Sequence, residues 1–137
     1  TGEIKLPVAA SVANMFACKI VLIRVVPTPG TLQGTGAAVG MLLPGTTAAM
    51  LRYEVPEASQ YLREIAAEWF PERTVSIEVL RGQVETELER SLVKYQADLL
   101  VMSTHGRSGL SAMLEGSIGQ RMVSRAVCPM LLLRLPD

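Results

Sequence analysis

Apolar and polar positions along the chain form short blocks of two different periods, which predict strands and helices in turn. Three apolar runs, interrupted only by Arg24 and Arg134, have the length of buried parallel strands: Ile20–Val26, Leu99–Met102 and Met130–Leu135. Val75–Val79 alternates instead, and it predicts an edge strand with one solvated face. Apolar residues recur at helical spacing in four segments: Leu6–Ala17, Pro56–Trp69, Val84–Tyr95 and Ser117–Ala126. Strands that alternate with helices indicate parallel β/α packing with right-handed crossovers.

This order of elements begins on a helix, whereas a doubly wound sheet begins on a strand. Taking Ile4–Val8 as that strand would leave only about ten residues before Ile20, too few for a crossover helix. Either the first strand is absent from this sequence, or something else fills its place. The question bears on function because ligands of such sheets bind at the carboxyl ends of the central strands.

The segment Gly30–Leu51 is rich in glycine, threonine and alanine, and it is predicted to be a long loop. Its GTGAAVG sequence resembles a dinucleotide fingerprint, but the third glycine comes one place late and two prolines separate it from the strand. We therefore reject that interpretation. The uncharged stretch Val25–Leu51 contains three prolines and five glycines, so it is not predicted to span a membrane.

Composition limits the classes of function. The 137 residues predict one domain over 1–137, and 49% hydrophobic with only 4% aromatic residues predicts an aliphatic core. Thirteen basic and thirteen acidic side chains leave no net charge, which argues against a nucleic-acid partner. On the helix that starts at Val84, the charged residues are expected to form a solvated face: Glu85, Glu87, Glu89 and Arg90.

The cysteines and the single histidine limit location and metal chemistry. Cys18 and Cys128 lie far apart without a CxxC motif, and we expect both to be small buried residues of a reducing compartment. One histidine without a cysteine cluster provides no zinc ligand set, so no metal site is predicted. No signal-peptide pattern is visible at the N-terminus. We expect a cytoplasmic protein that does not bind membranes.

The segment Leu99–Ser117 carries the candidate chemistry. Its apolar strand runs into Ser103-Thr104-His105-Gly106, and nine residues later Gly116-Ser117 precedes a helix. Backbone N–H groups at a helix start bind phosphate, and glycines let the anion approach the backbone closely. Alternatively, the glycines only allow positive φ angles and Ser117 only caps the helix. Glycine-rich turns are weakly specific, so the spacing leaves both readings open.

These residues resemble the universal stress protein family. Its nucleotide-binding members carry G-x2-G-x9-G-[S/T] after the fourth strand, to which Met102–Gly106 followed by Gly116-Ser117 is similar. The ending Cys128–Arg134 and the helix-then-strand region Leu6–Val26 also look like that family. The resemblance covers essentially the whole chain and is strongest over 98–134. It implies a flavodoxin-like, doubly wound α/β fold with a five-stranded parallel sheet of order 3-2-1-4-5 and helices on both faces, of which the first strand is not evident here.

The resemblance also implies a nucleotide site and a role for each residue. Val25 and Met102 would contact adenine, Ser103, His105 and Gly106 would surround the ribose and phosphates, and Gly116, Ser117 and Ile118 would bind the β- and γ-phosphates. Arg107 can offer charge-assisted hydrogen bonds to phosphate, although a plain surface arginine is an equal alternative. The implied ligand is ATP or AMP, with or without Mg²⁺.

Three departures from the family pattern bear on that site. Serine replaces the first glycine, so the motif reads S-x2-G-x9-G-S from Ser103. Glu115 stands beside Gly116, and a carboxylate aimed at a triphosphate would repel it by roughly 1 kcal/mol. The family's adenine-reading aspartate follows the first strand, so it has no counterpart that can be assigned in this sequence.

No catalytic residue is predicted. His105 has no nucleophile or metal motif to activate, and the chain lacks the G-x4-G-K-[S/T] motif of rapid nucleotide hydrolysis. The first hypothesis is a small dimeric stress-response module that binds ATP or AMP. The second is a nucleotide-free scaffold of the same fold, and the third is a slow ATPase or autophosphorylating protein. Because an apolar edge strand needs cover, a homodimer is predicted through Met130–Leu135.

Overall fold

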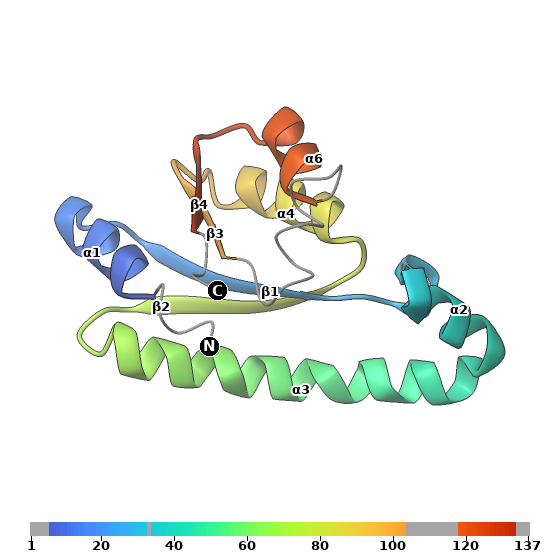
Figure 1. Ribbon diagram of the computed structural model, residues 1–137. Helices are drawn as coiled ribbons and strands as arrows, with labels where there is room; N and C mark the ends of the chain where they lie inside the picture. Colours follow the sequence, from blue (N-terminus) through green and yellow to red (C-terminus); the bar gives the residue numbers. More distant parts are fainter. Residues whose placement is uncertain (1–5, 33, 104–117, 134–137) are drawn as a thin grey trace. The chain divides into compact units, whose positions relative to one another are not determined.

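The computed structural model describes residues 6–32, 34–103 and 118–133, with strands and helices alternating along the chain (Figure 1). These residues fall into two compact units. Lys19–Glu87 forms the central unit, and the described residues of Thr1–Cys18 and Leu88–Asp137 form the terminal unit. The predicted strands and helices are all present, with ends that shift by one or two residues in most cases.

The central unit is built on two parallel strands, β1 (Ile20–Val26) and β2 (Val75–Arg81). They pair in register over their whole length, from Ile20 opposite Val75 to Val26 opposite Arg81. The β-branched and aliphatic residues that predicted β1 pack well on a pleated surface. Parallel strands of this kind need a long crossover, and the helix that makes it covers one face of the pair.

That crossover helix is α3 (Pro44–Trp69), and it carries the main apolar stripe of the central unit. Its buried residues recur at helical spacing: Thr47, Leu51, Ala58, Leu62 and Ile65. Leu51 and Ala58 form a buried cluster with Val26 of β1. The helix ends as predicted at Trp69, and the N–H of Phe70 donates to the carbonyl of Ala66 at 3.0 Å.

The predicted loop over Gly30–Leu51 is wrong. A 3-10 helix η2 (Pro29–Thr31), helix α2 (Gly34–Leu42) and the first turns of α3 occupy this segment. Pro44 stands at the first turn of α3, where a missing N–H costs nothing. The expected start at Pro56 is also wrong, because α3 runs through that proline, which lies on the exposed side of the helix. Glycine content favours a loop locally, but packing of α2 on its neighbours outweighs it.

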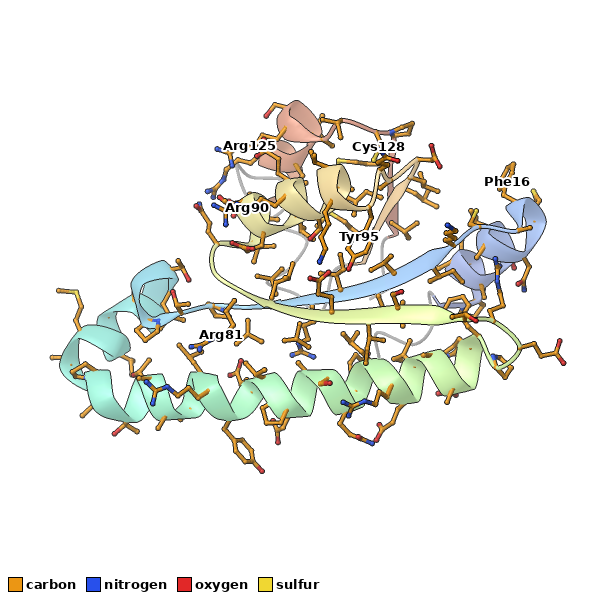
Figure 2. All side chains as sticks on the ribbon, turned by 180° about the vertical axis from the view of Figure 1, so that it is seen from behind. Phe16, Arg81, Arg90, Tyr95, Arg125 and Cys128 are labelled. Carbon is orange, nitrogen blue, oxygen red and sulfur yellow. The ribbon has the colours of Figure 1, made fainter. Side chains whose placement is uncertain are left out.

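The terminal unit contains α1 (Leu6–Phe16), β3 (Leu100–Ser103), α6 (Ile118–Arg125) and β4 (Met130–Leu133). β3 and β4 are parallel, from Leu100 opposite Met130 to Ser103 opposite Leu133. Helix α4 (Val84–Lys94) begins in the central unit and continues into this one. Its Leu88 and Leu92 are buried, as is Met122 of α6. Arg125 of α6, labelled in Figure 2, lies 3.8 Å from the Glu89 carboxylate.

Two expectations about burial are wrong. Glu85 is only 1% exposed, because the buried face of α4 carries Glu85 with Leu88 and Leu92 at i, i+3 and i+7. A carboxylate in the first turn is favourable at the positive end of a helix dipole. Cys18 is exposed rather than part of the core, since it follows the end of α1. Phe16, which ends α1, is likewise exposed (Figure 2).

The pairing of the strands confirms the doubly wound α/β class. The expected order 3-2-1-4-5 counts a first strand that is not described here, so β1, β2, β3 and β4 correspond to its strands 2, 3, 4 and 5. That order makes strands 2 and 3 neighbours, and strands 4 and 5 neighbours. The observed pairs β1–β2 and β3–β4 are these neighbours. Within the described residues each strand has one strand partner, and β1 is the first strand of the chain. A first strand, the element that the sequence pattern did not supply, is therefore also missing from the part of the chain that the structure describes.

The end of α4 yields a prediction about stability. Gln96 has a φ of +48°, its N–H donates to the carbonyl of Val93 at 3.2 Å, and the Ala97 N–H donates to that of Leu92 at 3.0 Å. This hydrogen-bond pattern is a Schellman cap, where glycine is preferred. We expect Gln96→Gly to raise the free energy of unfolding by about 1 kcal/mol, since the left-handed conformation strains a residue with a β-carbon.

Urea denaturation measures this effect, and Gln96→Ala is its matched control. Alanine keeps the β-carbon and so keeps the strain, while it removes the same polar side chain. A gain in stability for the alanine variant as large as that for glycine would show that the side chain of Gln96, and not its backbone, limits stability.

Candidate functional site

The carboxyl ends of β1 and β2 lie side by side, with Val25 opposite Leu80 and Val26 opposite Arg81. Val26 is buried against α3. Because successive side chains of a strand point to opposite faces, Val25 faces away from α3. It therefore presents a half-buried apolar side chain near the strand end, and its contact with adenine stays a prediction.

The turn that follows β1 is held by two threonines. The Thr28 N–H donates to Oγ1 of Thr31 at 2.8 Å, and the two hydroxyl oxygens lie 3.0 Å apart. The Thr31 N–H donates to the carbonyl of Thr28 at 3.0 Å, which closes the turn. Sequence reasoning missed these residues, although threonines directly after a predicted strand are a recognisable signal of a hydrogen-bonded turn.

Gly82 lies in the chain between the end of β2 and the start of α4, and it is hydrogen-bonded to the end of β1. Its N–H donates to the carbonyl of Val26 at 3.1 Å, and its φ is +146°. A β-carbon there would lie 3.0 Å from Oε1 and 3.2 Å from Cγ of Glu87. The positive φ therefore favours glycine at this position, and a β-carbon would also crowd the Glu87 side chain. Gly82 was also missed, and its place between a strand and a helix is the signal that identifies it.

In the terminal unit, β3 ends with the two residues predicted to face the nucleotide, Met102 and Ser103. Met102 is half-buried and pairs with Leu132. Helix α6 is described from Ile118, which is half-buried as well, and the predicted start at Ser117 lies outside the described residues. The other predicted site residues lie outside the described residues: His105, Gly106, Arg107, Gly116 and Ser117. Their roles remain predictions.

Two arginines of the central unit lie on the α3 side of its strands. Arg81 ends β2 and is exposed, and Figure 2 shows it on the side of α3. Arg24 of β1 lies over the ring of Tyr61 of α3, with its guanidinium carbon 5.7 Å from the ring centroid. By strand alternation both arginines face away from the side that Val25 faces. Neither therefore shares a face of the strand pair with the predicted adenine contact.

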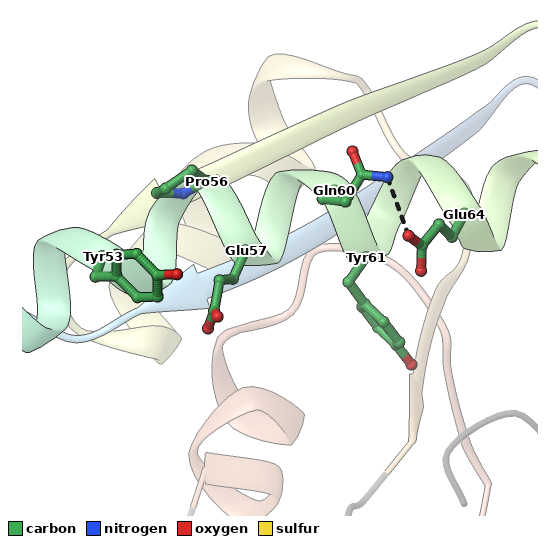
Figure 3. A pocket seen from close by; sticks show the side chains of 6 residues that line it. All are labelled: Tyr53, Pro56, Glu57, Gln60, Tyr61 and Glu64. Carbon is green, nitrogen blue, oxygen red and sulfur yellow. Dashed lines mark hydrogen bonds between the residues drawn. The ribbon is translucent and has the colours of Figure 1, made fainter.

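A shallow depression of about 450 Å³ lies along the outer side of α3 (Figure 3). Its walls are Tyr53, Pro56, Glu57, Gln60, Tyr61 and Glu64. Gln60 donates to the Glu64 carboxylate at 3.0 Å. Two carboxylates and no cation line this surface, so it would repel a phosphate. It is open and one-sided, and it does not qualify as the nucleotide site.

Within residues 6–32, 34–103 and 118–133 no helix is long and apolar enough to cross a membrane. The same residues contain no group of three or more histidine, cysteine or acidic side chains that could hold a metal ion. The two cysteines are free thiols. The only histidine of the chain, His105, lies outside these ranges.

Comparison with known proteins points to one family. The model of the Universal stress protein family matches residues 6–134. A universal stress protein of Methanocaldococcus jannaschii, MJ0531, is 34% identical over 87 residues, which cover 64% of this chain and 50% of that protein. A universal stress protein of Thermus aquaticus is 34% identical over 56 residues, which cover 41% of each chain. The matched region thus spans half or less of these curated relatives.

Solved structures agree on the fold. The hypothetical protein MJ0577 superimposes with a TM-score of 0.72 at 18% identity, covering 98% of this chain and 88% of that one. The universal stress protein UspA from Lactobacillus plantarum gives a TM-score of 0.68 at 20% identity, with 92% and 84% covered. At these identities the likeness establishes a flavodoxin-like α/β fold.

Proposed function

The chain belongs to the universal stress protein family, and from this premise we propose that it binds an adenine nucleotide, ATP or AMP, through the segment that follows β3. The observation that carries the proposal is the position of the motif. β3 ends at Ser103 and α6 begins at Ile118. The S-x2-G-x9-G-S motif therefore runs from the carboxyl end of a parallel strand to the N-terminus of a helix, the position at which α/β sheets bind phosphate.

In this proposal different residues contact the adenine ring, the ribose and the phosphates. Val25 and Met102 contact the adenine ring through apolar side chains, both of which are half-buried at strand ends. Ser103, His105 and Gly106 surround the ribose and phosphates, and Arg107 adds a charge-assisted hydrogen bond. Gly116, Ser117 and Ile118 bind the terminal phosphates through backbone N–H groups and the serine hydroxyl. Mg²⁺ bound by the phosphates would offset the repulsion from Glu115.

The proposed role is that of a cytoplasmic regulatory module that assembles as a homodimer through Met130–Leu135. Two observations support it. β4 pairs with β3 along one edge only within the described residues, so its second edge is open to a partner strand. Cys18 and Cys128 are free thiols, as in a reducing compartment. Bound nucleotide would report a cellular state, since the chain carries no Walker A lysine for rapid turnover.

A nucleotide-free scaffold of the same fold is the second candidate. Ser103 in place of a glycine and Glu115 beside Gly116 favour it, because the first adds a side chain and the second adds negative charge near the phosphates. Slow hydrolysis or autophosphorylation is a third reading, with a serine or threonine of the segment as the acceptor.

Calorimetry with the purified chain tests the proposed function. ATP with Mg²⁺ and AMP are titrated separately, and we expect a dissociation constant of about 1 μM to 10 μM for at least one of them. Native mass spectrometry of the freshly purified protein should show the nucleotide already bound. Absence of binding for both ligands at millimolar concentration would exclude the nucleotide module in favour of the scaffold.

A further inference from the structure

The last residues of β1 and β2 divide between the two faces of the strand pair. Val26 of β1 is buried against α3, and Val79 of β2 packs against the same buried cluster. Figure 1 shows α3 along this face of the pair. Successive side chains of a strand point to opposite faces of a sheet. Leu80 of β2 therefore faces away from α3, on the same side as Val25 of β1.

Val25 and Leu80 lie directly beside each other on that face. The register pairs Val25 with Leu80 and Val26 with Arg81, so the ladder continues past this pair. Neighbouring strands lie about 4.8 Å apart. Beyond the ladder, the Gly82 N–H donates to the carbonyl of Val26 at 3.1 Å, which holds the end of β2 against the end of β1. The side chains of Val25 and Leu80 thus form one apolar surface, which we call the strand-end platform.

The charges of the two strands indicate which part of a nucleotide fits the strand-end platform. The arginines of β1 and β2, Arg24 and Arg81, share the face of Val26 and Val79 and not that of the platform. Glu78, two residues before Leu80 on β2, lies on the same face as the platform. A carboxylate repels phosphate, whereas it does not repel an uncharged base. The platform therefore suits the base of a nucleotide and not its phosphates.

The width of the strand-end platform indicates which base fits it. A purine has two fused rings and is wider than one valine side chain, so Val25 alone cannot cover it. Side chains on two adjacent strands offer an apolar surface for both rings. A pyrimidine has one ring and gains less from the second residue, because the burial energy scales with the apolar area removed from water. Leu80 therefore adds more to the binding of a purine than to that of a pyrimidine.

We propose that Leu80 is a specificity-determining residue of the nucleotide site. Together with Val25 it packs against one face of the base, and it makes the chain prefer a purine nucleotide to a pyrimidine nucleotide. This inference rests on the proposed function, in which Val25 contacts adenine. Leu80 lies one residue beyond the predicted strand Val75–Val79, so the sequence pattern did not single it out. Its pairing with Val25 in the register is the observation that assigns the role.

Calorimetric titrations with ATP and UTP test the role of Leu80, because these ligands share the ribose and triphosphate and differ in the base. For Leu80→Ala we expect the dissociation constant for ATP to rise about tenfold and that for UTP to rise less than about threefold. The matched control is Val79→Ala, which truncates the neighbouring residue on the opposite face. It should leave the ratio of the two constants unchanged, because a structural loss acts on both ligands equally.

The results for the unchanged protein separate this proposal from the proposed function. If the unchanged protein does not bind ATP, both are overturned. If it binds ATP and UTP equally well, or if Leu80→Ala keeps the ATP-to-UTP ratio of the unchanged protein, only the role of Leu80 is overturned.

Photolabelling of the unchanged protein covers the case in which Leu80→Ala does not fold. Light converts bound ATP that carries an azide on its adenine ring into a nitrene, which inserts into bonds next to the base as dinitrogen leaves. Trypsin cleaves after Arg73 and Arg81 and so releases residues 74–81, which contain Leu80. Mass spectrometry should find the label on this peptide, and excess ATP should suppress it. A label found only on other peptides would show that the base does not lie over Leu80.

Discussion

Gly116→Val is expected to abolish ATP binding while the chain stays folded. The reason is steric: phosphate bound by backbone N–H groups at a helix start needs a closely approaching backbone, and a branched side chain blocks that approach. Gly116 lies two residues before the first residue of α6. Calorimetry should show at least a hundredfold loss of affinity, which corresponds to about 3 kcal/mol. Gly45→Val is the matched control, because a β-carbon on Gly45 meets no atom within 4 Å.

Glu115 provides an electrostatic test of the same site. Glu115→Gln removes one negative charge and keeps the shape of the side chain. If the carboxylate faces the phosphates, the affinity for ATP should rise about fivefold, equivalent to about 1 kcal/mol, while that for adenosine stays unchanged. An equal gain for both ligands would contradict the electrostatic argument. Undiminished ATP binding by Gly116→Val would move the site away from this segment altogether.

The second large effect concerns the last strand. The N–H of Leu100 donates to the carbonyl of Pro129 at 3.0 Å, so Pro129 directs its backbone toward β3. Backbone groups of successive residues alternate between the two edges of a strand, and those of Leu132 therefore face the edge away from β3. Leu132→Pro removes the N–H that would pair with a second copy and leaves the donors toward β3 in place.

Light scattering of Leu132→Pro should show half the native mass of the unchanged protein. Leu132→Ile is the control, since it keeps the N–H and favours a strand, and its mass should not change. A folded Leu132→Pro protein with unchanged native mass would place the dimer contact elsewhere than the edge of β4.

The strands were predictable because their signal is local. The run Ile20–Val26 forms β1 with the bounds that the sequence predicted, and Pro27 follows it. β-branched and aliphatic residues favour a pleated, buried surface wherever the strand pairs, and proline cannot extend the ladder. The same reasoning ended the next predicted strand but one at Met102, one residue before the end of β3 at Ser103. The two elements that border the candidate site were thus fixed by sequence, whereas the roles of residues 104–117 remain predictions.

The helices were harder to predict where packing outweighs propensity. Glycine at Gly36 and Gly40 argues for a loop when only neighbours in sequence are considered. Both glycines nevertheless belong to α2, which contacts α3 and η2, and a β-carbon on either glycine would make only ordinary contact with Leu32 or Thr47. Packing also outweighed the local signal at Glu85. Its charge predicted a solvent-exposed position, but Glu85 lies on the same face of α4 as Leu88 and Leu92 and is buried with them.

The sequence by itself determined the class of this protein, the order of its strands and of its helices other than η2 and α2, and the motif that joins β3 to α6, because periodicity and turn residues act over a few positions. The tertiary structure decided what depends on contacts between distant residues. It paired β1 with β2 and β3 with β4, extended α3 through Pro56, and turned Met41 and Leu42 of α2 to solvent. Side-chain packing between distant segments sets these features, and no local pattern encodes which neighbour a helix face will meet.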